Sequence, residues 1–197
     1  MPGRLRAALN SVSMKTLLTL AGALATALVG AALAAPLPDA PESTEGFRNF
    51  DLPAEQRESF ELSFEAVPLA DKIDCFTGLA ESEARRGNDV AVLVRYSDAG
   101  TIDVRNGSAF ASDRALAYSA NARYRVRMVV DMAKKTYSVF VAPAGQPEVA
   151  LARNYAFRTG QGSAKSLGKM VLAGFKGANG FAGGHRVSGI ALKPATP

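Results

Sequence analysis

The sequence contains no tryptophan, a single cysteine and a single histidine. Because Cys75 has no second cysteine to pair with, an intramolecular disulfide is excluded and a hydrophobic core must stabilise the fold. Cys75 lies in an apolar segment with strand character, so we expect it to be buried. A thiol nucleophile would need a base, and His185 lies far along the chain with no motif that links the two. The lack of tryptophan also removes the largest aromatic platform available to a sugar-binding surface.

The N-terminal segment lacks acidic residues and has the composition of an export signal. Arg4, Arg6 and Lys15 precede an apolar, alanine-rich run over residues 17–35. The small residues at 32–34 fit a signal-peptide cleavage site. A single transmembrane anchor is the alternative, because the apolar run is nearly long enough to span a bilayer.

We predict that residues 1–34 are a cleaved signal peptide, so that the mature protein is secreted or periplasmic and keeps no membrane segment. Met14 is a second candidate start, since the segment that follows it forms a compact signal alone. Cleavage removes three basic residues and no acidic residue, which lowers the formal net charge from +5 to +2. With so small a charge we expect no nucleic-acid partner.

The segment after the signal has a low content of large apolar residues. Residues 35–57 are rich in proline, serine and acidic side chains, which predicts a linker or a loosely docked N-terminal arm. Phe47 and Phe50 are its candidate contacts with the domain. Residues 54–58 follow Pro53, a residue suited to a helix start, and are a candidate for one helical turn.

Residues 122–142 give the clearest indication of the fold, because they have the pattern of one β-hairpin. Apolar and polar side chains alternate with a period of two on both sides of a short polar turn. If Asp131 faces Thr136, the alternating apolar residues of both strands reach one face, and a one-residue slip would scatter them. The residues on this inward face are Tyr124, Val126, Met128, Val130, Tyr137, Val139 and Val141.

Residues 90–96 and 101–105 form a second predicted hairpin, joined by a three-residue loop that ends in glycine. Its register places Arg95 opposite Asp103, as a cross-strand ion pair. Roughly nine or ten such short strands follow one another, with turn residues between them and no convincing long helix. We therefore predict one all-β domain over residues 58–193, an antiparallel β-sandwich of jelly-roll type.

The succession of strands resembles the concanavalin A-like lectin/glucanase superfamily. The resemblance is strongest in RYRVRMVVDMAKKTYSVFV, where a strand that ends in Asp turns into a strand of alternating Tyr and Val. IDCFTGLAES and the following DVAVLVRYSDAGTIDVRNG are similar to laminin-G-like bacterial extracellular modules. The resemblance covers residues 59–192, and its motifs are structural rather than catalytic. It implies a concanavalin A-like fold and glycan binding, which in some such modules is accompanied by a calcium ion.

Arginines line the outward side of the first strand of the central hairpin. In the predicted register Arg127 faces Phe140 and Arg125 faces Ala142. Guanidinium groups fork onto carboxylates and an aromatic ring offers a platform, a combination that suits an acidic polysaccharide. The structural alternative is a solvated face on which the arginine stems cover apolar surface. Our candidate glycan-binding residues are Arg123, Arg125, Arg127 and Phe140.

Enzymatic functions have weaker candidates in this sequence. Glu61 and Glu65 share a strand face, but at ~3.3 Å per residue they lie about 13 Å apart. A retaining glycosidase needs its two carboxyl groups about 5–5.5 Å apart. A polysaccharide lyase needs a base, for which His185, Tyr124 and Tyr155 are the candidates, although we expect His185 to be a loop residue beside two glycines.

We therefore predict an exported, non-catalytic module that binds glycans. The alternatives are an extracellular polysaccharide lyase or hydrolase of jelly-roll fold, and a structural or adhesion module that binds a protein. Calcium is the one cofactor left open, with Asp71, Asp74 and Asp89 as candidate oxygen donors from neighbouring loops, although no spacing matches a calcium loop. The sequence leaves the oligomeric state open.

Overall fold

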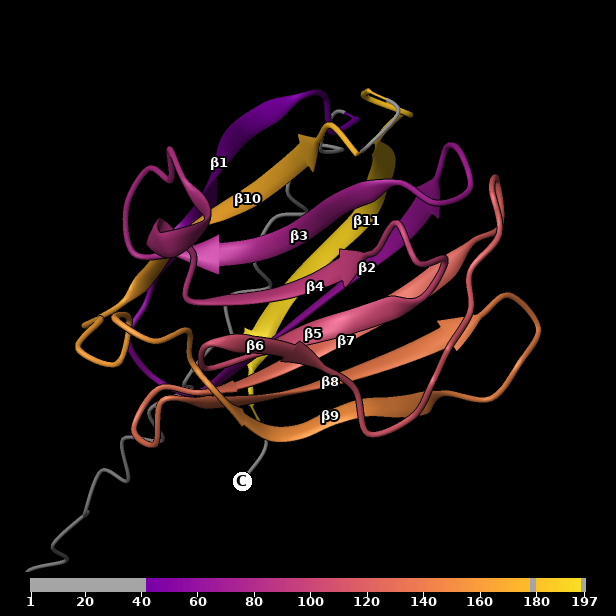
Figure 1. The fold of residues 1–197 in the computed structure, drawn as a ribbon. Helices are drawn as coiled ribbons and strands as arrows, with labels where there is room; N and C mark the ends of the chain where they lie inside the picture. The colour runs from indigo at the N-terminus through magenta and orange to yellow at the C-terminus, as the bar shows by residue number, and fades with distance from the viewer. Residues whose placement is uncertain (1–41, 178–179, 196–197) are drawn as a thin grey trace, which may run out of the picture. The chain divides into compact units, whose positions relative to one another are not determined.

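The computed structural model describes residues 42–177 and 180–195, which form two antiparallel sheets packed face to face (Figure 1). This confirms the predicted all-β sandwich. The six-stranded sheet has the order β1 (Gly46–Gln56), β10 (Leu167–Phe175), β3 (Asp74–Ala80), β4 (Val92–Tyr96), β5 (Ile102–Asn106) and β6 (Ala109–Ala111). The five-stranded sheet has the order β11 (His185–Pro194), β2 (Phe60–Pro68), β7 (Tyr124–Asp131), β8 (Thr136–Pro143) and β9 (Val149–Ala156).

The predicted signal peptide, residues 1–34, lies outside the described residues, as do residues 35–41. In the part of the chain that the structure describes, the one helical element is a 3₁₀ turn, η1 (Gly87–Asp89). Consequently no helix there is long and apolar enough to cross a membrane.

Residues 46–56 of the predicted N-terminal arm form a strand of the sandwich, so the expected linker is wrong for these residues. β1 pairs with β10 in unbroken register from Gly46 to Asp51, and again at Gln56. The helical turn expected after Pro53 is therefore absent, because this stretch completes a sheet edge. Phe47 does dock against the domain, with its ring centroid 6.0 Å from that of Phe76.

The central hairpin has the predicted register. β7 and β8 pair from Asp131↔Thr136 to Tyr124↔Pro143. β2 pairs on the other side of β7 and places Phe64 opposite Val126. The inward-facing residues predicted from the alternation are all buried, because every second side chain of β7 and β8 points at the opposite sheet.

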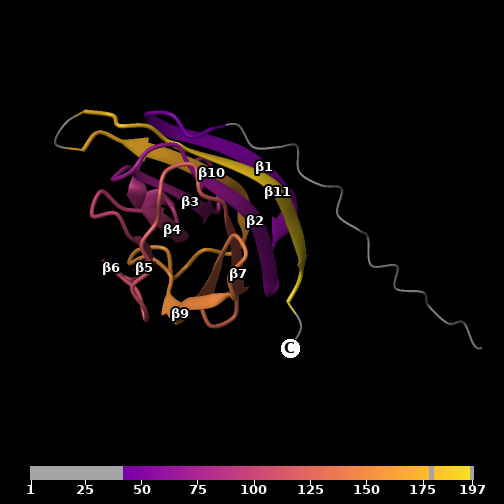
Figure 2. The same cartoon turned by 90° about the vertical axis from the view of Figure 1, so that its right-hand side faces the viewer.

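The core lies between the two sheets, which are seen from a second direction in Figure 2. Cys75 on β3 is fully buried there, as expected. The second hairpin also forms as predicted: Arg95 on β4 donates to both carboxylate oxygens of Asp103 on β5, at 2.9 and 2.7 Å.

A second, smaller apolar cluster lies on the other side of the six-stranded sheet. Phe76 and Leu93 are buried there, and the loop between β3 and β4 contributes Ala84 and Val90. The sequence pattern alone did not indicate this cluster, because it depends on a loop folding back over the sheet.

Candidate functional site

Arg123, Arg125 and Arg127, here called the arginine row, lie on the outer face of the five-stranded sheet. Tyr124 and Val126 between them point into the core, so the alternation of β7 keeps the guanidinium groups outside. The outward orientation that the sequence predicted is confirmed. The three arginines nevertheless differ in their partners, and this difference decides which of them is available to a ligand.

Arg127 is the most constrained of the three. It forms a bidentate ion pair with Glu148, in which Nε donates to Oε2 at 3.0 Å and Nη2 donates to Oε1 at 2.6 Å. Its Nη1 lies 3.3 Å from Glu61 Oε2, and its guanidinium carbon lies 4.0 Å from the centre of the Phe140 ring. The hydrogen bonds with Glu148 raise the pKa of Arg127 and lower that of Glu148.

Phe140 contacts a second guanidinium as well. The guanidinium carbon of Arg153 on β9 lies 5.4 Å from the ring centre, and Arg127 lies closer. Sequence reasoning paired Phe140 with Arg127 correctly but missed Arg153, since β9 pairs with β8 through an irregular register. In this structure Phe140 is a partner for arginines rather than a bare platform for a sugar ring.

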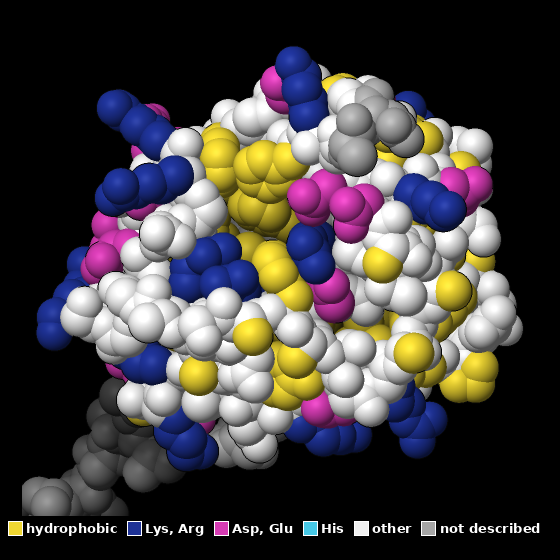
Figure 3. Space-filling view, in the orientation of Figure 1, with side chains coloured by type: hydrophobic (Ala, Val, Ile, Leu, Met, Phe, Trp, Pro, Cys, Tyr) yellow, Lys and Arg dark blue, Asp and Glu magenta, His cyan; other side chains and the backbone are white. Residues whose placement is uncertain are grey.

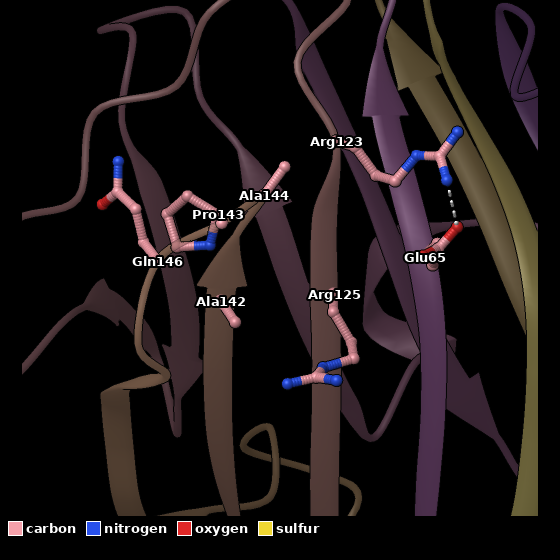
Figure 4. Close-up of a pocket in the computed structure, with 8 residues that line it drawn as sticks. Glu65, Arg123, Arg125, Ala142, Pro143, Ala144 and Gln146 are labelled. Carbon is pink, nitrogen blue, oxygen red and sulfur yellow. Dashed lines mark ion pairs between the residues drawn. The ribbon is translucent and has the colours of Figure 1, made fainter.

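Arg125 is the arginine of the row that forms no ion pair among the described residues, although its charge also helps to lower the pKa of Glu148. Arg123 pairs with Glu65 at 3.3 Å, whereas no carboxylate of the described residues lies within ion-pair distance of Arg125. Figure 4 shows Arg123 turned toward Glu65 and Arg125 extending toward the side of Ala142. Beside Arg125 is a hollow of about 240 Å³ that these side chains line together with the turn over residues 143–146.

The structure buries His185 instead of placing it in a loop, which corrects our expectation. His185 begins β11 and is fully buried between two hydroxyl groups, with Nδ1 2.8 Å from Ser43 Oγ and Nε2 2.7 Å from Thr77 Oγ1. Burial lowers its pKa from 6.5 to about 3. The reason for the error is that β11 starts immediately after the glycines that suggested a loop.

The other two candidate bases for a lyase are also unavailable to a substrate. The Tyr124 hydroxyl is in the core and accepts from the backbone N–H of Ser119 at 3.0 Å. The Tyr155 hydroxyl donates to Asp113 at 2.8 Å, and burial raises its pKa to about 12. None of the three candidate bases therefore faces the arginine row as a free group.

The two glutamates of β2 are in ion pairs on the outer face rather than arranged as a catalytic pair. Glu61 lies 3.1 Å from Lys193 as well as contacting Arg127, and Glu65 pairs with Arg123.

The three candidate calcium donors are only partly brought together. Asp71 and Asp74 line one hollow of about 380 Å³ with Asp98, but Asp89 instead accepts hydrogen bonds from the backbone N–H groups that open η1. Asp74 lies 3.8 Å from Arg95. Among the described residues, no group of histidine, cysteine and acidic side chains has the arrangement of a metal site.

The outer face of the six-stranded sheet carries an aromatic surface that the sequence did not indicate. The rings of Phe47, Phe76 and Phe175 lie 5.6–6.0 Å apart, and Phe110 has Arg95 at 3.6 Å over its ring. Figure 3 shows hydrophobic side chains on this face next to basic ones. These aromatics come from four different strands, so their proximity follows from the strand order.

No family model matches this sequence. Among curated proteins, a gellan lyase from Bacillus sp is 28% identical over 111 residues, which are 54% of this chain and 4% of that enzyme. The chain thus spans only a small fraction of the length of the relative that it matches.

Solved structures with a similar fold include both lectins and a glucanase. Lectin I-B4 from Griffonia simplicifolia, in a metal-free form, has a TM-score of 0.53 at 10% identity, covering 80% of this chain and 86% of the lectin. A family 131 β-glucanase catalytic domain from Podospora anserina has a TM-score of 0.51 at 12% identity, covering 79% and 68%. Lectin II from Ulex europaeus has a TM-score of 0.50 at 10% identity, covering 80% and 85%.

The chain has the concanavalin A-like lectin/glucanase fold, as the sequence resemblance implied. Identities this low establish the fold alone. Because the same fold appears in binding proteins and in an enzyme, the choice between these functions depends on the site.

Proposed function

We propose that this chain is a non-catalytic carbohydrate-binding module for an anionic polysaccharide, which it binds on the outer face of the five-stranded sheet. The observation that supports this function is Arg125, whose exposed guanidinium has no ion-pair partner in the described part of the chain and borders a hollow. A guanidinium binds a carboxylate through two parallel hydrogen bonds. Arg127 and Glu148 already form such a pair on the same face.

The neighbouring charges are arranged so that they do not repel an anionic ligand at Arg125. Arg123 neutralises Glu65, the acidic residue of the hollow, and Arg127 neutralises Glu148. The repulsion that these glutamates would exert on an anionic polymer is thereby reduced. A non-catalytic role is supported by the burial of His185, the only histidine of the chain.

The test is a comparison of polymers that differ in charge. We expect the protein to bind polygalacturonate, alginate or gellan and to bind neutral dextran much more weakly, with an affinity for the anionic polymers that falls as salt increases. Arg125→Ala is expected to weaken binding about tenfold or more, because a hydrogen bond to a charged group contributes about 1.5–3 kcal/mol.

Arg85 provides the matched control, since it is also exposed but lies in the loop before η1, away from the five-stranded sheet. Arg85→Ala should leave the affinity unchanged. Equal losses of affinity in the two variants would mean that net charge, and not the position of Arg125, controls binding. Equal binding of dextran and polygalacturonate would refute an anionic ligand.

A polysaccharide lyase is the second candidate, which the partial similarity to a gellan lyase favours. Lyases leave unsaturated sugar ends that absorb ultraviolet light. Incubating the protein with each anionic polymer and recording that absorbance separates the two functions: a steady rise would establish the enzyme, and we expect none.

We also infer that the protein is exported, with residues 1–34 removed as a signal peptide. The composition of the segment supports this inference. Mass spectrometry of the protein from the culture medium or periplasm should give a chain that begins at Ala35. Recovery of the intact chain in the membrane fraction would favour the anchor instead.

A further inference from the structure

Two arginines without a countercharge meet at the β5–β6 end of the six-stranded sheet. Arg105 is on β5, and Arg158 follows β9. The carbonyl of Gly107 connects their two segments, since it accepts from Nε of Arg105 at 3.1 Å and from the backbone N–H of Thr159 at 3.2 Å. The backbone N–H of Arg158 is itself bonded to Ala91 O, which holds this segment against the start of β4.

Both guanidinium groups use only some of their donors within the protein. Arg105 donates to the carbonyls of Gly107 and Ser108, and Arg158 donates from Nη1 to Asn88 Oδ1 at 2.9 Å. Nε of Arg158 is buried but has no hydrogen-bond partner. A buried donor without an acceptor costs free energy, so a well-packed surface normally provides one.

Arg105 and Arg158 differ from Arg125 in being partly buried. No carboxylate of the described residues lies within ion-pair distance of Arg105 or Arg158, whereas Arg95 on the same face is held by Asp103. Burial lowers the pKa of Arg158, and the positive charge of Arg105 lowers it further. Burial likewise lowers the pKa of Arg105. The carbonyl of Gly107, shared by Arg105 and the residue after Arg158, thus holds two partly buried cations in adjoining segments.

We propose that Arg105 and Arg158 form a binding site for an oxyanion, a carboxylate or sulfate group, on the outer face of the six-stranded sheet. The oxyanion accepts from the Nη groups of the two arginines that have no partner within the protein, whereas Nε of Arg158 is too deeply buried to reach it, and the anion balances the charge that no side chain balances. The ring of Phe110, 4.8 Å from the guanidinium carbon of Arg105, borders the site. This site is separate from the arginine row and does not depend on the proposed polysaccharide ligand.

Thermal unfolding in sodium sulfate, against sodium chloride at equal ionic strength, tests the site with inorganic sulfate as the probe. A ligand that binds only the folded state raises the Tm, by roughly 3–6 °C at ten times its dissociation constant for a domain of this size. The rise that counts is the saturable part at low sulfate concentration, because concentrated sulfate stabilises any folded protein by exclusion from its surface. We expect Arg158→Gln and Arg105→Gln each to abolish this saturable rise. Arg125→Gln removes an arginine from the other sheet and should keep the rise, so failure here and failure of the proposed function are distinguishable.

The source of the oxyanion is found by comparing free sulfate with dextran sulfate and polygalacturonate. Tighter binding of one polymer than of free sulfate, lost in Arg158→Gln, would assign the site to a polymer-borne group. Equal affinity per sulfate would assign it to a free anion. A sulfate-dependent rise that persists in both Arg105→Gln and Arg158→Gln, or no rise in the wild-type protein, overturns the proposal.

Discussion

His185 should make the stability of this protein depend on pH in a way that one substitution can isolate. Its imidazole is fully buried and neutral, and it joins three elements: the N-terminal segment through Ser43, β11, and β3 of the opposite sheet through Thr77. A neutral imidazole has one donor and one acceptor, which the two hydroxyl groups satisfy. Protonation would add a charge to this site without a carboxylate to balance it.

The direction of the effect follows from the two pKa values. Burial lowers the pKa of His185 from 6.5 to about 3, so below pH 6.5 the unfolded chain takes up a proton that the folded chain does not. Stability is therefore fully present above pH 6.5 and is lost as the pH falls toward 3. The slope is about half of 1.4 kcal/mol per pH unit at pH 6.5 and approaches that value below it, so between pH 6.5 and pH 4.5 the loss is about 2.3 kcal/mol.

The assay is urea denaturation at several pH values, on the wild-type protein and on His185→Gln. The variant loses some stability at every pH, but its carboxylates titrate as in the wild type, so the difference in slope isolates His185. Because the chain has one histidine, its NMR signal in untagged protein needs no assignment. Parallel stability curves, or a His185 signal that titrates near pH 6.5 in the folded protein, would refute the reasoning.

Three further outcomes depend on the core. Val126→Asp should prevent folding, since it removes a fully buried side chain that contributes ~1.5–3 kcal/mol and places an unpaired charge there; a wild-type melting curve would mean that the wrong face of β7 is inside. Cys75 should react with a thiol reagent only after denaturation, because burial raises its pKa, and rapid labelling of the native protein would contradict its position. Gly78→Ala should destabilise the protein by ~1–3 kcal/mol in urea unfolding, because the added Cβ would lie 2.6 Å from Val90 Cγ1. An unchanged midpoint would show that Val90 can move away at no cost in free energy.

The strands that alternate most regularly could be predicted closely, and so could the outward direction of their polar residues. In β7 and β8 one register brings the inward-facing apolar side chains of both strands onto the same face, so the alternation by itself determined the pairing of Arg127 with Phe140. Arg125 was identified by the same reasoning. That Arg125 forms no ion pair was not predictable, because it depends on the neighbouring Glu65 and Glu148 pairing with the other two arginines of the row in the folded protein.

The sequence by itself determined the fold class, the two hairpins and which side of β7 faces water, because these depend on side-chain period and on neighbours within a few residues. The tertiary structure decided the rest. β1 became a strand only because β10 offers it an edge, and His185 became a core residue only because Ser43 and Thr77 meet it there. The proximity of Arg105 and Arg158 also depends on chain segments about fifty residues apart, whose contact local patterning does not encode.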